Sequence, residues 1–250
     1  MEKKLSNKVA VITGGSAGIG LATAKLFAAE GAKVVITGRK LDALNNAAKE
    51  IGHGAIAVQA DSSNLLDLER LYKTVNEKFG KIDVLIANAA VYILSPLANF
   101  TEEQFDKQSN INFKGTFFTI QKALNYLNDE ASIILLSSIA NTKAMPGHSS
   151  YSATKAAIRS MGRSFAVELL PRKIRVNVMT PGPIDTDVLD QVTSTKEEAS
   201  SMKAGMAQFT PVKRLGKPEE IAAGLLYLAS DDSKFMLGAE LILDGGIMSL

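Results

Sequence analysis

Seven short apolar runs alternate with segments of helical length along the whole chain. The runs are rich in Val and Ile, do not alternate strictly between apolar and polar residues, and cover 8–13, 33–37, 55–59, 82–87, 132–137, 174–179 and 239–244. Such runs are typical of parallel strands buried on both faces. The helical segments between them span 19–30, 40–51, 65–79, 102–127, 151–170 and 218–229. This order predicts an α/β fold, with a doubly wound, Rossmann-type sheet of seven parallel strands and helices on both faces.

One segment departs from this alternation. Residues from about 184 to 210 are rich in Ser, Thr, Lys, Glu and Met, and the segment is too long for an ordinary loop between a helix and a strand. Long irregular insertions in such folds often form mobile lids over an active site. The rest of residues 1–250 contains no linker, repeat or low-complexity stretch. We therefore expect a single dinucleotide-binding and catalytic domain with a substrate lid at about 184–210.

Composition narrows the functional classes. The net charge is +2 and its charges are dispersed, so no basic footprint for nucleic acid or an anionic membrane is present. The chain has no cysteine, which excludes disulfides, thiolate catalysis and cysteine-bound zinc, and its two histidines are isolated, so no metal site is expected. No stretch approaches the roughly 18 uninterrupted apolar residues of a membrane span. Glycines and hydroxyls interrupt the signal-like N-terminus, so we expect a cytoplasmic protein.

A glycine-rich turn, TGGSAGIG, joins the first predicted strand to the first predicted helix. The N-terminus of a helix offers free N–H donors and partial positive charge, and a Cβ in the turn would hold a pyrophosphate away from them. Gly14, Gly18 and Gly20 therefore point to a dinucleotide. Their spacing is not G-x-G-x-x-G, and a tight glycine turn without a ligand remains the alternative.

The residues at the end of the second predicted strand indicate which dinucleotide binds. An acid about 20 residues after the glycines usually binds the ribose 2′-hydroxyl, but here Gly38 is followed by Arg39 and Lys40. An acid would repel a 2′-phosphate, whereas an arginine can bind it through several donors. The pattern favours NADP(H) over NAD(H). The alternative is that both residues are solvated charges at the start of a helix.

Tyr151 and Lys155 lie four residues apart in SSYSATKAAI, on one face of a predicted helix. The four-residue spacing alone is weak evidence for a catalytic pair, but the motifs along the rest of the chain make it specific. Over essentially its whole length the chain resembles the short-chain dehydrogenase/reductase family, in its NADP(H)-preferring branch similar to glucose and 3-oxoacyl reductases. The matching elements, in order, are the turn Thr13–Gly20, Asp61, Asn88–Ala90, Asn112 in NFKG, Ser138 in LLSS, Tyr151, Lys155 and Pro181–Thr186. Ala90 departs from the family, which usually has glycine there.

The resemblance implies a catalytic set of Asn112, Ser138, Tyr151 and Lys155. A hydride added to a carbonyl leaves an alkoxide that needs a proton, and a tyrosine with a pKa near 10 is a ready acid but a poor base. We expect Lys155, with the positive charge of an oxidised nicotinamide, to lower the pKa of Tyr151 by about two to three units. Ser138 would hold the substrate oxygen, with its neighbour Ser137 on the opposite face. Asn112 would hold a water that links Lys155 to solvent.

The resemblance also implies the cofactor contacts. The glycine turn would bind pyrophosphate, Asp61 adenine, Asn88 the ribose, and Ile184 and Thr186 the carboxamide. The full expected set is Gly14, Ser16, Gly18, Ile19, Gly20, Arg39, Lys40, Asp61, Ser62, Asn88, Tyr151, Lys155, Pro181, Gly182, Ile184 and Thr186.

The expected substrate pocket is largely apolar. Its wall would come from 91–94, from 140–148 and from the lid residues Val188, Leu189, Val192, Met202, Met206 and Phe209. His148 could contact a polar substituent, although a solvated loop histidine is the alternative.

These observations favour an NADPH-dependent reductase of a ketone, 3-oxoacyl, steroid-like or sugar-like compound. An NAD-linked alcohol dehydrogenase and a non-catalytic dinucleotide-binding scaffold or sensor remain alternatives. Family analogy indicates a homotetramer or dimer formed through the 102–127 and 151–170 helices and the C-terminal segment.

Overall fold

A computed structural model describes residues 3–187, 193 and 195–250, and its sheet matches the predicted one. Seven parallel strands pair in the order β3-β2-β1-β4-β5-β6-β7. The strands are β1 Val9–Thr13, β2 Lys33–Gly38, β3 Ile56–Gln59, β4 Ile82–Ala87, β5 Leu127–Leu136, β6 Arg175–Pro181 and β7 Glu240–Leu243. The order reverses direction between β1 and β4, which is where doubly wound sheets place their ligands.

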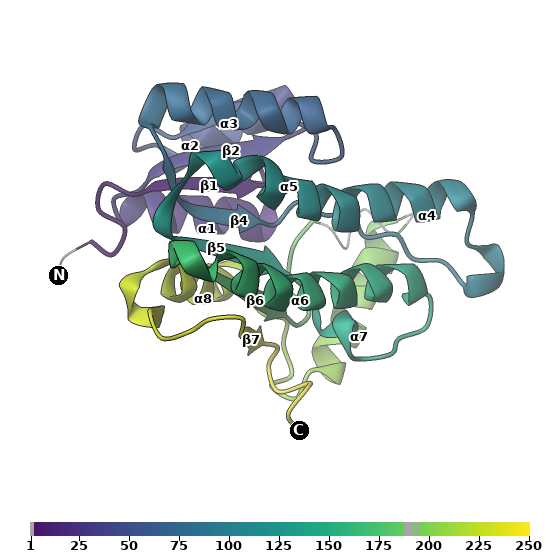
Figure 1. The fold of residues 1–250 in the computed structure, drawn as a ribbon. Helices are drawn as coiled ribbons and strands as arrows, with labels where there is room; N and C mark the ends of the chain where they lie inside the picture. Colours follow the sequence, from purple (N-terminus) through teal and green to yellow (C-terminus); the bar gives the residue numbers. More distant parts are fainter. Residues whose placement is uncertain (1–2, 188–192, 194) are drawn as a thin grey trace.

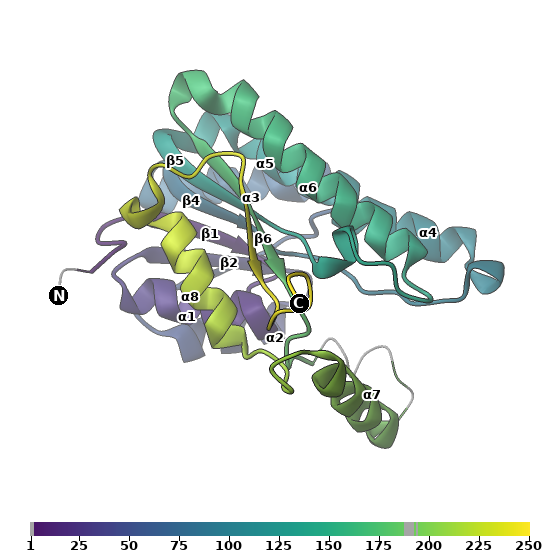
Figure 2. The same cartoon turned by 90° about the horizontal axis from the view of Figure 1, so that it is seen from below.

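Helices cover both faces of the sheet (Figures 1 and 2). Figure 2 shows α3 (Leu65–Phe79), α5 (Thr116–Ala123) and α6 (Ser149–Leu169) on one side of the strands. On the other side lie α1 (Gly18–Ala29), α2 (Leu41–Ile51) and α8 (Pro218–Ala229). Each layer has its own buried apolar cluster against the sheet. The single Rossmann-type domain is therefore confirmed.

The predicted helix over 102–127 is interrupted. It consists of α4 (Glu102–Ser109), a π-helical segment (Asn110–Gly115), α5 and a 3₁₀ turn (Leu124–Tyr126). Leu127 begins β5 instead of ending a helix, and it pairs with Ile82 ahead of a register shift. The sequence hid this early part of the strand because polar residues and Glu130, at φ 66°, separate Leu127 from the apolar run that follows.

The segment expected to be irregular contains a regular helix. α7 (Lys196–Phe209) begins at Thr195, whose side chain accepts a hydrogen bond from the Glu198 N–H at 3.1 Å. Glu197 and Glu198 lie in its first turn, where acidic side chains favour a helix start. The helix lies beyond the carboxyl ends of the strands (Figure 2). The irregular lid was thus predicted wrongly in its local structure, because its polar composition masked a capped helix.

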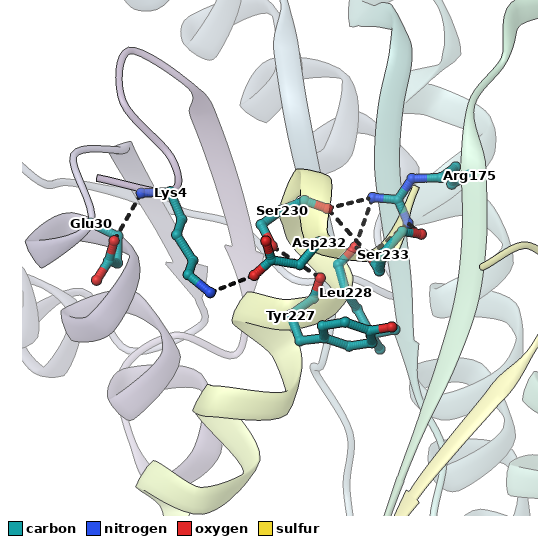
Figure 3. Close-up of polar contacts among 8 residues, drawn as sticks. All are labelled: Lys4, Glu30, Arg175, Tyr227, Leu228, Ser230, Asp232 and Ser233. Carbon is teal, nitrogen blue, oxygen red and sulfur yellow. Dashed lines mark hydrogen bonds and ion pairs between the residues drawn. The ribbon is translucent and has the colours of Figure 1, made fainter. Parts of the chain in front are cut away.

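Charged side chains fasten the end of the sheet opposite α7. Figure 3 shows Lys4, whose backbone N–H donates to Glu30 at 2.9 Å and whose ammonium pairs with Asp232 after α8. Arg175, at the start of β6, donates to the carbonyls of Leu228 at 2.9 Å and Ser233 at 3.1 Å. Arg175 thus satisfies the carbonyl group of Leu228 in the last turn of α8 and that of Ser233 in the 3₁₀ turn that follows. The described part of the chain contains no helix long and apolar enough to cross a membrane.

Candidate active site

A cavity of about 590 Å³ opens beyond the carboxyl ends of β1, β4, β5 and β6. Most of the sequence-predicted site residues line it, from the glycine turn at one end to Tyr151 at the other. These are Gly14, Gly18, Ile19, Gly20, Asn88, Ser138, Tyr151, Lys155, Pro181, Gly182, Ile184 and Thr186. The other predicted residues, Ser16, Arg39, Lys40, Asp61, Ser62 and Asn112, do not line it.

The glycine turn has no room for side chains. A Cβ on Gly20 would lie 2.2 Å from the carbonyl oxygen of Gly14, and a Cβ on Gly14, whose φ is 65°, would lie 2.9 Å from Nδ2 of Asn88. α1 begins at Gly18, and Ala17 before it has no side chain that could cap the first N–H groups. The turn therefore presents backbone donors to the cavity.

Asn88 holds this turn in place. Its Nδ2 donates to the carbonyl oxygens of Thr13 at 2.9 Å and Gly14 at 3.1 Å. The Thr13 hydroxyl in turn accepts from the backbone N–H groups of Asn88 and Ala89, both at 3.0 Å. Ala90, which replaces a family glycine, is exposed at the cavity wall. The Ala90 methyl group is accommodated while Asn88 keeps its hydrogen bonds to Thr13 and Gly14.

The predicted cofactor residues at the ends of β2 and β3 lie outside the cavity. Arg39 and Lys40 are exposed, and the Ser16 hydroxyl faces the same place, since it would lie 3.9 Å from a Cβ on Gly38. Asp61 accepts hydrogen bonds from the Ser63 N–H at 2.9 Å and hydroxyl at 2.7 Å, while Ser62 is buried.

Ser138 and Tyr151 meet inside the cavity. Tyr151 lies in the first turn of α6 and lines the cavity together with Ser138, which follows β5. Ser137 turns the other way and donates to the carbonyl oxygen of Lys155 at 3.0 Å. The structure thus separates the two neighbouring serines as strand alternation predicts.

Burial dominates the electrostatics of Tyr151. Burial raises the pKa of Tyr151 above its ordinary value, proximity to Tyr92 adds to this, and the Ser138 hydrogen bond opposes it. Burial also lowers the pKa of Lys155 to about 8. The Lys155 ammonium donates to the carbonyl oxygen of Leu136 at 2.8 Å and lies 5.6 Å from the centre of the Tyr151 ring. Among the protein's own groups, desolvation of the phenol thus dominates the pKa of Tyr151, and the lowering expected from Lys155 together with an oxidised nicotinamide stays a prediction.

Asn112 is fully buried in the π-helical segment between α4 and α5. Its Oδ1 accepts from the N–H of Val91 and its Nδ2 donates to the carbonyl oxygen of Val91, both at 2.8 Å. Nδ2 also lies 3.4 Å from the hydroxyl of Thr154 on α6. A π-bulge widens a helix locally and is frequent at functional sites. Here Asn112 links the cavity wall to α6.

His148 is buried, which excludes the alternative of a solvated loop histidine. Its Nδ1 lies 2.8 Å from the Pro146 carbonyl oxygen, and its Nε2 lies 2.6 Å from the hydroxyl of Tyr92. The Tyr92 ring packs edge-on against Tyr151, with 4.7 Å between the ring centres. Sequence reasoning placed Tyr92 only within an apolar wall. It missed the pair because residues 92 and 148 are far apart in the chain and no motif joins them.

The remaining wall is mostly apolar, and Asp187 adds a carboxylate to it. Met206 and Phe209 of α7 line the cavity as predicted, together with Val91 and Met145 from the two predicted loop segments. Met202 does not line it, and the predicted Val188, Leu189 and Val192 lie outside the described residues. Among the described residues, no group of three or more His, Asp or Glu side chains is placed to bind a metal ion.

Known proteins resemble this chain over nearly its full length. The sequence profile of the family described as enoyl-(acyl carrier protein) reductase matches residues 14–248. Oxidoreductase asL5 of Sarocladium schorii is 42% identical, over 99% of this chain and 98% of its own. The NADP-dependent (R)-specific alcohol dehydrogenase of Lentilactobacillus kefiri is 38% identical, over 98% of both chains. The crystal structure of a short-chain dehydrogenase/reductase of the glucose/ribitol dehydrogenase type from Brucella melitensis superposes with a TM-score of 0.92, at 34% identity over 99% of both chains.

Proposed function

The chain belongs to the short-chain dehydrogenase/reductase family and is an oxidoreductase that acts on alcohols or carbonyl compounds, and from that premise we propose that it is an NADPH-dependent carbonyl reductase. Its substrate would be a small, largely apolar ketone or the corresponding secondary alcohol, with Tyr151 as the general acid/base. The observation that carries this proposal is the buried Tyr151, placed with Ser138 and Lys155 in one cavity with the glycine turn.

The glycine turn fits a dinucleotide. Its backbone donors face the cavity, and the glycines at 14, 18 and 20 place no side chain between those donors and a phosphate. In the proposal, Gly14, Gly18, Ile19 and Gly20 bind the pyrophosphate. The other predicted cofactor residues keep the contacts that the family resemblance implies, with Ile184 and Thr186 at the nicotinamide end.

NADP(H) preference rests on charge at the end of β2. Arg39 and Lys40 are exposed there, the Ser16 hydroxyl faces the same surface, and no acidic side chain occupies the position after Gly38. Arginine binds phosphate through paired donors, so this arrangement favours a 2′-phosphate over a free hydroxyl. The NADP-dependent alcohol dehydrogenase of Lentilactobacillus kefiri supports the same choice.

The catalytic residues then act on the substrate oxygen. When bound, NADPH supplies a hydride to the carbonyl carbon. Ser138 donates a hydrogen bond that holds the carbonyl oxygen beside Tyr151, and the Tyr151 hydroxyl donates its proton to that oxygen. The raised pKa of Tyr151 keeps the phenol protonated, which is the form that reduction requires.

Lys155 and Asn112 support this proton transfer. The Lys155 ammonium is held under Tyr151 by the Leu136 carbonyl, where its charge stabilises the phenolate that reduction produces. The pKa of about 8 lets Lys155 release a proton near neutral pH and so help to restore the phenol. Asn112 fixes Val91 and the adjoining cavity wall, and the family resemblance adds a bound water for the relay.

The test is turnover of a ketone panel, followed by NADPH absorbance, with wild type and Tyr151→Phe. The variant keeps the ring and its packing but has no proton to give, so we expect kcat to fall by about 10²- to 10⁴-fold with NADPH affinity unchanged. Tyr227→Phe, on exposed α8, is the matched control and should behave as wild type. Turnover that survives in Tyr151→Phe would contradict the assigned proton donor, and cofactor binding without any turnover would favour a scaffold.

Assembly and location belong to the same proposal. Large apolar side chains are exposed on α4–α6 and, separately, on α8 and the C-terminal segment, and these two surfaces support a homotetramer, with a dimer as the alternative. They include Phe105, Phe113, Phe117, Val167 and Leu170 on the first surface and Tyr227, Phe235, Leu237, Ile242 and Leu250 on the second. A cytoplasmic location stays a prediction that rests on the sequence.

A further inference from the structure

Tyr92 and His148 form a polar pair in a mostly apolar wall of the cavity. Both side chains line it, beside Met145, Met206 and Phe209. The mechanism proposed above does not use either residue. A hydrogen-bonded pair placed next to the proposed proton donor nevertheless affects which substrate groups can lie there, because a buried polar atom favours a ligand that completes its hydrogen bonds.

The direction of the hydrogen bonds in this pair follows from its partners. The Pro146 carbonyl oxygen only accepts, so Nδ1 of His148, 2.8 Å away, carries the proton. In the neutral imidazole, Nε2 is then an acceptor, and the Tyr92 hydroxyl donates to it across 2.6 Å. Burial raises the pKa of Tyr92 to about 12, which keeps this phenol protonated.

The hydroxyl proton of Tyr92 is therefore used in the hydrogen bond to His148. A ligand in the cavity can meet only the lone pairs of the Tyr92 oxygen. Within the described residues, His148 is the one hydrogen-bond partner that the structure gives the Tyr92 hydroxyl. A lone pair can accept a hydrogen bond but cannot donate one. The pair thus suits a ligand group that has a proton to give, and it offers nothing to an ether or a second carbonyl group.

The pair is also rigid. The residues on either side of Tyr92 are fixed by buried side chains, Val91 by Asn112 and Ile93 by Gln108, whose Oε1 accepts from the Ile93 N–H at 2.9 Å. The two loops are joined by the Ser95 N–H, which donates to the Gly147 carbonyl oxygen at 3.2 Å. Side chains held in this way bind a ligand without losing conformational entropy of their own.

The position relative to Tyr151 places the selected group near the reacting carbonyl. The Tyr92 and Tyr151 rings are in edge-on contact, and the Tyr92 hydroxyl is close enough to affect the pKa of Tyr151 electrostatically. We propose that Tyr92 and His148 form a donor-selective subsite, in which the Tyr92 oxygen accepts a hydrogen bond from a hydroxyl or N–H group of the substrate close to its carbonyl. The preferred substrate class is then a hydroxylated ketone, and this specificity rests on the carbonyl reductase function proposed above.

The experiment compares two ketones of nearly equal shape, 2-hydroxycyclohexanone and its methyl ether 2-methoxycyclohexanone. The quantity measured is the ratio of their kcat/KM values with NADPH, in wild type, in Tyr92→Phe and in the matched control Tyr227→Phe. Tyr92→Phe keeps the ring contact with Tyr151 and removes only the oxygen. We expect this variant to lower the hydroxy/methoxy ratio by roughly 2- to 10-fold, while the control leaves it unchanged.

A second variant tests the direction of the hydrogen bond. In His148→Leu the Tyr92 hydroxyl loses its acceptor and is free to donate, so the ratio should shift toward the methyl ether. The subsite is refuted if the ratio in wild type, Tyr92→Phe and His148→Leu agrees within about twofold while ketones are still reduced.

Failure of the proposed function gives a different result. If Tyr151→Phe reduces both ketones as well as wild type, the proton donor is wrong, and the substrate ratio still reports on the subsite. If wild type reduces neither ketone, calorimetric binding of the two compounds to the NADPH-loaded protein replaces the rates. Tighter binding of 2-hydroxycyclohexanone that is lost in Tyr92→Phe supports the subsite, and equal affinities in both proteins refute it.

Discussion

The Nζ of Lys155 lies 5.6 Å from the centre of the Tyr151 ring, one helical turn along α6. Lys155 is 3% exposed, and its ammonium donates a hydrogen bond to the Leu136 carbonyl oxygen at 2.8 Å. A buried ammonium with so little solvation is costly for folding. The protein thus keeps a charge under the phenol at the expense of stability, as is common at functional sites.

This cost should be visible in the pH dependence of stability. Burial lowers the pKa of Lys155 from 10.5 to about 8 in the folded protein. Between these pH values the unfolded chain binds more protons at residue 155, so the free energy of unfolding should rise with pH, by at most about 1.4 kcal/mol per pH unit. We expect Lys155→Met to lose this rise. Urea unfolding of both proteins at pH 7.5 and 10 measures it, and equal pH slopes would contradict the prediction.

Arg39 should control the choice of cofactor. A charge-assisted hydrogen bond to a 2′-phosphate contributes about 1.5 to 3 kcal/mol, so Arg39→Ala should weaken NADPH binding by roughly 10- to 150-fold and NADH binding far less. Cofactor fluorescence titration measures both affinities. Lys49→Ala, an exposed lysine on α2, is the control for loss of one positive charge. An equal loss for both cofactors would exclude a contact to the 2′-phosphate.

The sequence predicted the sheet well because buried parallel strands have a simple signature. Each apolar run became a strand, and the order of strands and helices left one common topology. The errors lie where local and tertiary effects compete. Leu127 was assigned to a helix because the polar residues after it separate it from its strand. The π-helical segment around Asn112 has no periodicity that distinguishes it from an α-helix.

The candidate site, too, was predicted where the secondary structure fixes a residue's position, and not where tertiary packing decides. Family spacing placed Ser138, Tyr151 and Lys155 on one cavity, since strand ends and a helix start fix their positions. The pKa of Tyr151 was not predictable from these residues, because it depends on how completely the phenol is buried. The pairing of Tyr92 with His148 was also hidden. It arises from two loops that meet only through the fold, and neither residue lies in a periodic segment.

Glu240 on β7 should stabilise the sheet edge behind the active site. Its carboxylate accepts from Thr180 and Asn141, both at 2.6 Å, and pairs with Arg159 on α6 at 2.6 Å. Burial acts to raise the pKa of Glu240, but these partners outweigh it and hold the pKa below its ordinary value. The carboxylate therefore contributes stability above about pH 4.5, and this contribution is lost as the pH falls further.

Glu240→Gln should accordingly lower the free energy of unfolding at pH 7 by about 1 to 3 kcal/mol, since Arg159 loses its counter-charge. The difference from wild type should shrink at pH 4. Denaturant unfolding at both pH values measures it. Glu50→Gln, which removes an exposed partner of Lys25, should change stability by less than about 0.5 kcal/mol. A pH-independent effect at residue 240 would show that packing, and not charge, is responsible.

The exposed face of α6 should be a subunit contact. Val167 is 73% exposed on this helix, one turn before the exposed Leu170, and both belong to the surface that the proposed tetramer would cover. A glutamate at residue 167 would bring its charge into that contact, close to its symmetry-related copies, and desolvation and repulsion would both oppose association. We expect Val167→Glu to sediment as a smaller species than wild type.

Leu66→Glu is the matched control for this assembly prediction. Leu66 is 72% exposed on α3, away from both proposed contact surfaces, so the same change of an exposed apolar residue to glutamate should leave the sedimentation coefficient unchanged. Because neither residue is buried within the subunit, neither substitution should destabilise the fold of the subunit itself. Sedimentation velocity at several protein concentrations measures the assembly. A wild-type protein that sediments only as a monomer, or a Val167→Glu variant that assembles as fully as Leu66→Glu, would place the contact elsewhere or remove it.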